Sequence, residues 1–533
     1  MRRGPRRGTA REPLRGCRHV SGARRSWRAH ATRRVPRGGA RARRHAGGRH
    51  ARRHPRAGRR RAARGGARGR TARRAVGQRH DRPGAARVND EELIALVCCD
   101  LGSIVRGRSC FASSIDQQLA QGVGWVPANH ALTPLGPVAE PNPFGSTGDL
   151  RLMPDPATRV RVEADAASEP RAGALDFMLC DIVETDGSPW ECCPRGFLRE
   201  TLTLLERELG ARAITSFEHE FQVLAWPLAD QPIAGLPFSL EAQRSSEPFA
   251  RRVMNALVEA GAEPERFFPE YAAHQFEIPL AAAEGLTGAD RAVVFREVVR
   301  EIARRLGRRA SFVPLLNPSE AGNGLHIHIS LLDAGGHPLL YDASRPGCLS
   351  ELGERFAAGV LRHACALSAL TAPSPVSAAR LAPHRWSAGA VCLATQNREA
   401  LLRIPPLFSL GGGEPERQMR LEYRGADASA NPHLALAAIL RAGLEGVREH
   451  LPAPPILDRD PAELAAADRE RYGVGALPAS LEEALEALSE DGQARGWLSP
   501  LMFEAYMSVK QAEVRAAERQ ALEETCRRYA AIY

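Results

Sequence analysis

The sequence predicts an α+β fold from about residue 89 onward, and two observations support it. Between residues 93 and 185, short apolar runs alternate with glycine- and proline-containing turns, a pattern typical of β-strands. From about residue 195, long segments with helical spacing of apolar residues interleave with strands, too irregularly for a doubly wound parallel sheet. At 533 residues the chain is long enough for two or three domains.

The first 88 residues differ sharply from the rest. They hold 31 arginines, no lysine and two acids, a formal balance of +29, so the remaining residues carry −18 of the overall +11. With few large apolar residues and no periodicity, the segment is expected to be disordered. Three interpretations of this segment are open. It is a basic arm that binds nucleic-acid phosphates, an arginine-rich targeting peptide, or upstream sequence translated from a start codon assigned too early. The last is favoured, because the pattern changes abruptly at Val88. The acidic remainder argues against any other nucleic-acid footprint.

Cysteine spacing and hydropathy favour a cytoplasmic protein with reduced thiols. The 11 cysteines show no CxxC or Cys/His zinc spacing, and several lie within apolar runs. No apolar run approaches a transmembrane length, and no signal-peptide core is evident.

Residues 89–192 are predicted to form a small, mostly β domain. The stretch 93–107 is predicted to form a strand, a glycine turn and a second strand, and 148–162 a strand, a turn bounded by Pro154 and Pro156, and another strand. A further strand ends in an Asp-Gly turn at 186–187. Beyond this domain, apolar residues with helical spacing over 195–209 predict a helix that ends at Gly210.

Residues 193–533 are predicted to form a catalytic domain. Helices are expected at about 247–260, 351–370, 432–449, 480–489 and 500–530, and strands at 275–280 and 324–333. Another helix is expected to start from a Thr-x-x-Asp capping signature at Thr287 and to run to Gly307.

The stretch "SFEHEF", residues 216–221, raises the first functional question. In a strand, Glu218 and Glu220 share one face and His219 points to the other. Two like charges in such an apolar strand are either a solvated face or a pair of metal ligands.

Three further predicted strands, and one further stretch at 396–405, place polar side chains among apolar neighbours. His326 and His328 share a face after a glycine-rich turn, although a lone strand histidine is usually structural. The stretch 269–280 supplies Glu270 and Glu277, 420–424 supplies Glu422 and Arg424, and 396–405 supplies Arg398 and Arg403.

Because isolated carboxylates are costly to bury, shared cations are the economical explanation. Carboxylates with one histidine suit Mg²⁺ or Mn²⁺ better than zinc. Two metals with several arginines indicate phosphoryl transfer from a polyphosphate, without a Walker A or kinase glycine-rich loop. Each arginine could instead pair with surface acids.

Five motifs in order resemble the glutamine synthetase family over roughly residues 93–530. They are "FEHEF", "EYAAHQFEI", "GNGLHIHIS", "RLAP" with "NREALLRIP", and "RLEYRGADASANPHLALAAIL". The resemblance implies a β-grasp amino-terminal domain and a homo-oligomeric ring, a dodecamer or hexamer. It also implies a reaction in which ATP phosphorylates the γ-carboxylate of glutamate and an amine or ammonia displaces phosphate.

The resemblance also implies a role for each motif residue. The metal nearer glutamate is held by Glu220, Glu270 and Glu277, and the metal on the ATP phosphates by Glu218, His326 and Glu422. The resemblance assigns contacts with the substrate to Arg380, Asn323, Gly324, Glu220 and Arg403. It assigns contacts with the nucleotide to His328, Ser330, Arg398 and Arg403. Arg398, Arg403 and Arg424 stabilise the transferred phosphoryl group.

The sequence departs from the family pattern at the positions that bind ammonium in ammonia-using members. Ammonia-using members have a flap, Arg-Leu-x-Pro-Gly-x-Glu, whose glutamate helps to deprotonate ammonium; here Trp386 occupies that position. An indole cannot accept a proton from ammonium, although it can wall an apolar pocket or contact an alkylammonium. The amino-terminal Asp motif has no clear counterpart. Three hypotheses therefore stand: a γ-glutamyl-amine ligase, a glutamine synthetase with a modified flap, and a non-catalytic regulatory homologue.

Overall fold

The computed structural model describes residues 91–164, 173–224, 236–385 and 387–533. The arginine-rich segment 1–88 and Trp386, both singled out by the sequence, lie outside these residues. No helix in the described ranges is both long and apolar enough to cross a membrane.

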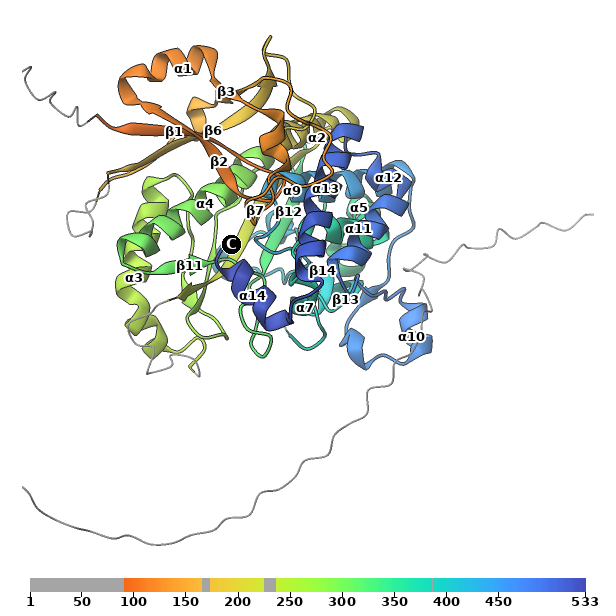
Figure 1. Cartoon of the computed structure of the whole chain (residues 1–533). Coiled ribbons are helices and arrows are strands. Elements are labelled where there is room, and N and C mark those ends of the chain that lie inside the picture. The colour runs from red at the N-terminus through yellow and green to blue at the C-terminus, as the bar shows by residue number, and fades with distance from the viewer. Residues whose placement is uncertain (1–90, 165–172, 225–235, 386) are drawn as a thin grey trace, which may run out of the picture. The chain divides into compact units, whose positions relative to one another are not determined.

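The amino-terminal sheet has six strands in the described part of the chain. They are β1 (Leu93–Cys99), β2 (Val105–Phe111), β3 (Val123–Trp125), β4 (Leu150–Pro154), β5 (Val160–Val162) and β6 (Leu175–Glu184). Their order is β2-β1-β6-β4-β3, with β5 also on β6, and only the β1–β6 pair is parallel. Figure 1 draws this sheet in orange and yellow next to α1 (Ile115–Gln121). The expected strands are confirmed here.

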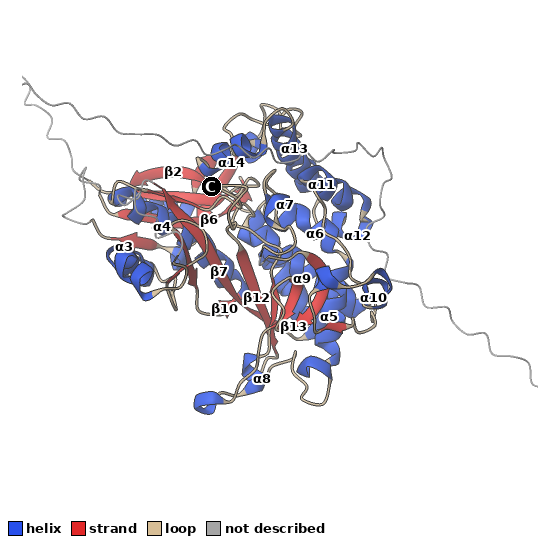
Figure 2. Ribbon diagram, turned by 90° about the horizontal axis from the view of Figure 1, so that it is seen from below, coloured by secondary structure: helices blue, strands red, loops and turns tan. Residues whose placement is uncertain are grey.

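The second sheet carries the residues that the sequence singled out. Its order is β16-β13-β14-β15-β12-β7-β9-β8, and β10 and β11 also pair with β7. The strands are β7 (Arg212–Leu224), β8 (Phe268–Pro269), β9 (Gln275–Pro279), β10 (Ala283–Glu284), β11 (Arg309–Ser311), β12 (Leu325–Leu332), β13 (Ala390–Thr395), β14 (Ala400–Ile404), β15 (Leu421–Tyr423) and β16 (Ile456–Leu457). Figure 2 shows β7 and β12 side by side in its centre.

Helices cover one face of this sheet and bury its apolar side chains. Phe221 of β7 packs with Phe249 of α3 and Phe295 of α4, and Ile327 of β12 belongs to the main core cluster. His219 of β7 also points to this side and stacks on Phe295 with ring centroids 4.3 Å apart. The α-helices that follow α1 in the described part of the chain, not all of which lie on this face, are α2 (Pro194–Leu209), α3 (Leu240–Glu259), α4 (Gly285–Arg305), α5 (Glu351–Arg362), α6 (Ala364–Thr371), α7 (Ser377–Arg380), α8 (Pro415–Gln418), α9 (Pro432–Arg448), α10 (Ala466–Arg471), α11 (Leu481–Glu490), α12 (Gly492–Arg495), α13 (Pro500–Ala517) and α14 (Leu522–Ala530).

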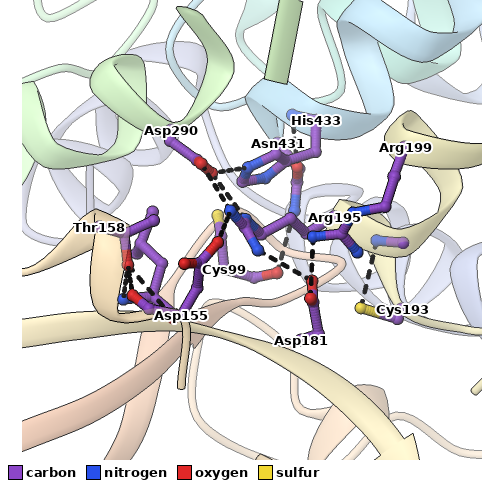
Figure 3. Close-up of polar contacts among 12 residues, drawn as sticks. Cys99, Asp155, Thr158, Asp181, Cys193, Arg195, Arg199, Asp290, Asn431 and His433 are labelled. Carbon is purple, nitrogen blue, oxygen red and sulfur yellow. Dashed lines mark hydrogen bonds and ion pairs between the residues drawn. The ribbon is translucent and has the colours of Figure 1, made fainter. Parts of the chain in front are cut away.

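A buried ion cluster ties the first sheet to the helices of the second (Figure 3). Arg195 of α2 pairs with Asp155 at 2.8 Å, with Asp181 of β6 at 3.1 Å and with Asp290 of α4 at 2.9 Å. Asp290 also pairs with His433 of α9 at 2.8 Å. Because a buried arginine that loses its partners is strongly destabilising, this cluster fixes how the two sheets meet.

Three predicted helices differ in their limits. The helix expected from about residue 247 starts at Leu240, where Ser239 caps it by accepting from the Ala242 N–H, and it accommodates Pro248. The helix expected over 351–370 is interrupted at His363, and the helix expected over 500–530 is two helices, α13 and α14. These interruptions are single-residue or four-residue breaks that apolar spacing does not reveal.

The predicted capping signature at Thr287 is also wrong. Helix α4 begins at Gly285, before Thr287, and no side chain caps its amino terminus. Asp290, which was expected to complete the signature, binds Arg195 and His433 instead. A long-range ion pair has therefore replaced the local capping interaction.

Candidate active site

Strand register places the predicted side chains in one row on the face opposite the helices. Directly opposed residues of antiparallel strands share a face. Glu277 of β9 lies opposite Glu220 of β7, and His326 of β12 lies opposite Glu218. Glu422 of β15 lies opposite His328 of β12 and also opposite Arg403 of β14. The shared faces expected for Glu218 with Glu220 and for His326 with His328 are thus confirmed, and the strand register extends the row across five adjacent strands.

At the β9 end of the row, three glutamates gather with little positive charge between them. Glu220, Glu270 and Glu277 are all largely shielded from solvent, and Glu277 is 8% exposed. Burial and the neighbouring Glu220 raise the pKa of Glu270 to about 7. Burial, Glu218 and Glu220 raise the pKa of Glu277 well above its usual range. Carboxylates held together in this way favour either a bound proton or a bound cation.

Nearer β15, Glu218 and Glu422 meet two histidines. His328 Nε2 lies 2.9 Å from Glu218 Oε1, while His326 Nδ1 lies 3.3 Å from Glu218 Oε2 and 3.9 Å from Glu422 Oε1. Burial alone would raise the pKa of Glu218, but His328 and His326 hold this pKa well below its usual range. Ligand atoms of Glu218, His328 and Glu422 lie within 4.8 Å of one another, close enough to share one ion.

Three arginines close this end of the row. Arg403 donates to Glu422 Oε2 at 2.7 Å, and Arg424 donates to Glu422 Oε1. Burial would raise the pKa of Glu422, but Arg424, His328 and His326 lower it to about 2, so the carboxylate stays ionised. Arg403 and Arg424 are 11% and 2% exposed at their side chains, which places two fixed cations beside the same carboxylate.

The third arginine, Arg420, was missed by the sequence analysis. Its Nε donates to His328 Nδ1 at 3.1 Å. Because a guanidinium only donates, His328 must accept at Nδ1, and a neutral ring then carries its proton on Nε2, facing Glu218. That tautomer leaves His328 without a free lone pair for a metal, and favours His326 as the imidazole ligand.

A glycine turn lets Arg380 approach the row from α7. A Cβ on Gly324 would lie 3.2 Å from His326 Nε2 and 3.3 Å from both Arg380 Nη1 and Glu220 Oε1. The Gly324 N–H donates to Glu220 Oε2 at 2.9 Å. A side chain at position 324 would therefore fill the space on which a histidine, an arginine and a glutamate converge.

The remaining predicted residues differ in how they are placed. Asn323 is fully buried, and its amide donates to Val313 O at 2.8 Å and accepts from Gln275 at 3.0 Å. Ser330 continues the face of His328 and donates to Met419 O at 3.0 Å. Arg398 is exposed in the β13–β14 connection and helps to lower the pKa of Glu270.

Gln275 is a second residue that the sequence analysis did not assign. Its amide nitrogen lies 2.8 Å from Gly322 O, 3.0 Å from Asn323 Oδ1 and 3.3 Å from Glu220 Oε2. It therefore locks the glycine turn to the carboxylate row. Its position in the motif "HQFEI", two residues before Glu277, was the signal that could have found it.

The donor set fits hard divalent cations. Within the described site the oxygen donors are the carboxylates of Glu218, Glu220, Glu270, Glu277 and Glu422, with imidazole as the other donor. Mg²⁺ and Mn²⁺ prefer such oxygen-rich sets, whereas zinc favours thiolates and histidines. Burial and the neighbouring carboxylates raise the pKa values of Glu270 and Glu277, and a cation bound between these groups would relieve their repulsion.

Comparison with known families agrees with this geometry. The family model "Glutamine synthetase, catalytic domain" matches residues 191–529, and "Glutamine synthetase N-terminal domain" matches residues 81–190. The chain belongs to the glutamine synthetase family. It is accordingly an ATP-dependent carboxylate–amine ligase, and this family generally uses divalent metal ions with ATP.

Relatives within the glutamine synthetase family carry two kinds of name. The chain is 32% identical over 430 residues to a γ-glutamylpolyamine synthetase, GlnA3, of Streptomyces coelicolor, covering 80% of this chain and 90% of the relative. It is also 32% identical over 370 residues to a glutamine synthetase of Thermus thermophilus, covering 68% of this chain and 81% of the relative. The family is therefore shown, while the relatives' names leave the amine substrate open.

Solved structures of the same family extend the likeness to three dimensions. A structure described as a novel glutamine synthase homologue is 44% identical, with a TM-score of 0.76, and the match covers 84% of this chain and all of that one. The ligand-free structure of GmaS is 25% identical, with a TM-score of 0.68, and the match covers 81% of this chain and 94% of that one.

Proposed function

We propose that the chain is a γ-glutamyl-amine synthetase, which phosphorylates the γ-carboxylate of glutamate with ATP and joins it to an organic amine. The row of carboxylates, histidines and arginines on β7, β9, β12, β14 and β15 supports the ligase chemistry most directly. Trp386, in place of the flap glutamate expected of ammonia-using members, supports an amine as the acceptor.

Two cation sites are proposed along the row. Glu220, Glu270 and Glu277 would hold one ion on the glutamate side, and Glu218, His326 and Glu422 would hold another on the nucleotide side. Such ions would supply charge neutralisation for phosphate and carboxylate oxygens. Glu218 and Glu220 lie on the same strand face, so β7 bridges the two sites.

The arginines have proposed roles that match their positions. Arg403 and Arg424, fixed on Glu422, would neutralise charge that develops on the transferred phosphoryl group, together with Arg398 from the neighbouring loop. Arg420 holds His328 so that Nε2–H can donate towards the nucleotide side, where Ser330 also lies. Arg380 would bind the α-carboxylate of glutamate beside Gly324.

The proposed reaction has two steps. A γ-carboxylate oxygen of glutamate attacks the γ-phosphorus of ATP, the bond to the bridging oxygen breaks, and ADP leaves. The amine nitrogen attacks the carbonyl carbon of the resulting acyl phosphate, phosphate departs, and the nitrogen loses one proton. Buried arginines contribute more to the charged transition state than exposed ones, because little water screens them.

A second candidate is a glutamine synthetase that uses ammonia through a modified flap. The relative from Thermus thermophilus, whose name is glutamine synthetase, favours it. A ring-shaped homo-oligomer, a β-grasp amino-terminal domain and domain limits at 89–192 and 193–533 are proposed with either candidate.

Initial rates of ADP release with glutamate, ATP and Mg²⁺ distinguish the candidates. The panel should contain ammonium, hydroxylamine, methylamine, ethanolamine, putrescine and spermidine, with mass analysis of each product. The proposal predicts that at least one organic amine gives a higher kcat/KM than ammonium. Ammonium preferred over every organic amine would assign the second candidate instead.

A further inference from the structure

The flap motif that begins at Arg380, together with the residues that follow it, connects α7 to β13. The structure describes this segment on both sides of position 386. At its base the Ser387 hydroxyl donates to Arg380 O at 2.8 Å, and the Gly389 N–H donates to Ser387 O at 2.8 Å. The two ends of the flap therefore meet beside the arginine that borders the carboxylate row.

Arg385 ties one side of the flap to the loop that precedes the glycine turn. Its Nη2 donates to Pro318 O at 2.7 Å, and its Nη1 donates to Glu320 O at 3.0 Å. A guanidinium is a rigid planar set of donors, so two acceptors fix its position more closely than one would. The same loop leads directly to Asn323 and Gly324 of the site.

Glu399, in the β13–β14 connection, ties the other side of the flap. Its Oε2 accepts from the His384 N–H at 3.1 Å. A Cβ on Gly389 would lie 3.0 Å from Glu399 Oε2 and 3.1 Å from Pro383 Cα, so a larger residue there would push the carboxylate and the flap apart. The same connection carries Arg398, which is proposed to act on the phosphoryl group.

The backbone conformation of His384 also has to be held by its surroundings. Its φ is 61°, in the left-handed region that is unfavourable for a residue with a Cβ, and the family pattern of the flap has glycine at this position. Such conformations persist where neighbouring contacts impose them. The bonds made by Glu399 and by Arg385 are those contacts.

We propose that Arg385 and Glu399 are positioning residues, which hold the flap between the glutamate side and the phosphoryl side of the site and so preform the place where the acceptor amine binds. This inference rests on the proposed function, because it takes the flap as the acceptor side of a γ-glutamyl-amine synthetase. Both residues act through the flap. A flap that is fixed before the amine arrives avoids the cost of ordering it on binding, and it excludes water from the acyl phosphate.

The glycine turn does not depend on Arg385 for its own position. The Asn323 amide donates to Val313 O at 2.8 Å, and Gln275 donates to Gly322 O at 2.8 Å. Because these bonds hold the turn from its other side, removal of the Arg385 side chain should release the flap more than it disturbs the glutamate-binding residues.

Arg385→Ala removes both hydrogen bonds and tests this role. We expect the KM for the best acceptor of the amine panel to rise about tenfold, while the KM values for glutamate and ATP stay within about twofold. Water that reaches the acyl phosphate hydrolyses it to glutamate and phosphate, so the amide formed per ADP released should also fall. Arg385→Lys, whose ammonium cannot bond both carbonyls in the same geometry, should give an intermediate acceptor KM.

Glu399 provides a second and independent test of the same role. Glu399→Ala removes the acceptor of the His384 N–H and should also raise the acceptor KM and lower the amide formed per ADP. Glu399→Gln keeps an oxygen that can accept this bond, so it should restore most of both values.

Arg151→Ala is the matched control. Arg151 of β4 also bonds two backbone carbonyls, with Nε donating to Gln121 O at 2.8 Å and Nη2 to Gly122 O at 2.7 Å, but in the amino-terminal sheet. This variant should leave the acceptor KM within about twofold and the amide formed per ADP unchanged, whatever its melting temperature.

The outcomes separate this inference from the function on which it rests. The amine panel with the unchanged protein decides the function, and the variants are then compared with whichever acceptor is best, ammonium included. An unchanged acceptor KM and an unchanged amide yield per ADP in both Arg385→Ala and Glu399→Ala would overturn the positioning role and leave the proposed function standing. A glutamate KM that rises as much as the acceptor KM, or an equal effect of Arg151→Ala, would also overturn it.

Discussion

Glu422 is the carboxylate that two arginines of the site share, and its replacement by glutamine tests that arrangement. The carboxylate accepts hydrogen bonds from Arg403 and Arg424, and the residue is 1% exposed. Glutamine keeps the size of the side chain but removes the charge. Two largely buried guanidinium groups then lose their shared counter-ion, which is the costly way to break a buried ion pair.

The magnitude follows from the pKa of Glu422. Its pKa is about 2 in the folded protein against an ordinary value of 4.5, a difference of 2.5 units. At about 1.4 kcal/mol per unit, the ionised carboxylate contributes about 3 kcal/mol to the stability of the folded state at pH 7. Because the folded pKa is the lower one, this contribution is present above pH 4.5 and is lost as the pH falls towards 2.

Thermal unfolding at several pH values is the assay. Glu422→Gln should lower the melting temperature at pH 7 by about 3 °C, and the difference from the unchanged protein should shrink in acid. Glu208→Gln is the control, since Glu208 pairs with Arg448 at a partly exposed site and should cost below about 1 kcal/mol. A Glu422→Gln variant no less stable than Glu208→Gln at pH 7 would refute the reasoning.

Three further substitutions test separate parts of the site. Glu277→Gln should raise the melting temperature of the metal-free protein, because it relieves repulsion with Glu220, and should weaken stabilisation by Mn²⁺; an unchanged Mn²⁺ shift would exclude Glu277 as a ligand. Gly324→Ala should lower kcat/KM about tenfold or more with little change in melting temperature, since its Cβ would lie 3.2 Å from His326 Nε2. Trp386→Glu should raise kcat/KM for ammonium relative to that for the best amine; an unaltered ratio would remove position 386 as the determinant of acceptor choice.

The site residues that lie on β-strands could be predicted because side chains along a strand alternate between its two faces with a period of two residues. Alternation alone placed Glu218 with Glu220 and His326 with His328, and register then brought these pairs together. Apolar neighbours on the other face leave no freedom for a shift by one residue, which would bury the charges against the helices.

Residues whose role depends on a partner far along the chain could not be found in this way. Arg420 reads as an ordinary arginine until β15 pairs with β12 and brings it to His328, 92 residues away in the sequence. Strands β13 and β14 were likewise not predicted, since both are buried and show no alternation.

The predicted limits of some helices were wrong for a related reason. Close packing at the start of α4, where a Cβ on Gly288 would lie 2.3 Å from Thr215 Oγ1, fixes that end more strongly than a local capping box. Tertiary contacts thus override local signals where elements approach most closely.

The central claim is that this member of the glutamine synthetase family joins glutamate to an organic amine in preference to ammonia. The most direct measurement is a single-vessel competition in which ammonium and putrescine are present at equal concentration with glutamate, ATP and Mg²⁺. Mass analysis then gives the ratio of γ-glutamylputrescine to glutamine at low conversion, which equals the ratio of the two kcat/KM values. We expect an excess of the γ-glutamyl amide, with putrescine replaced by the best amine of the panel if that differs. Glutamine as the main product against every amine would contradict it.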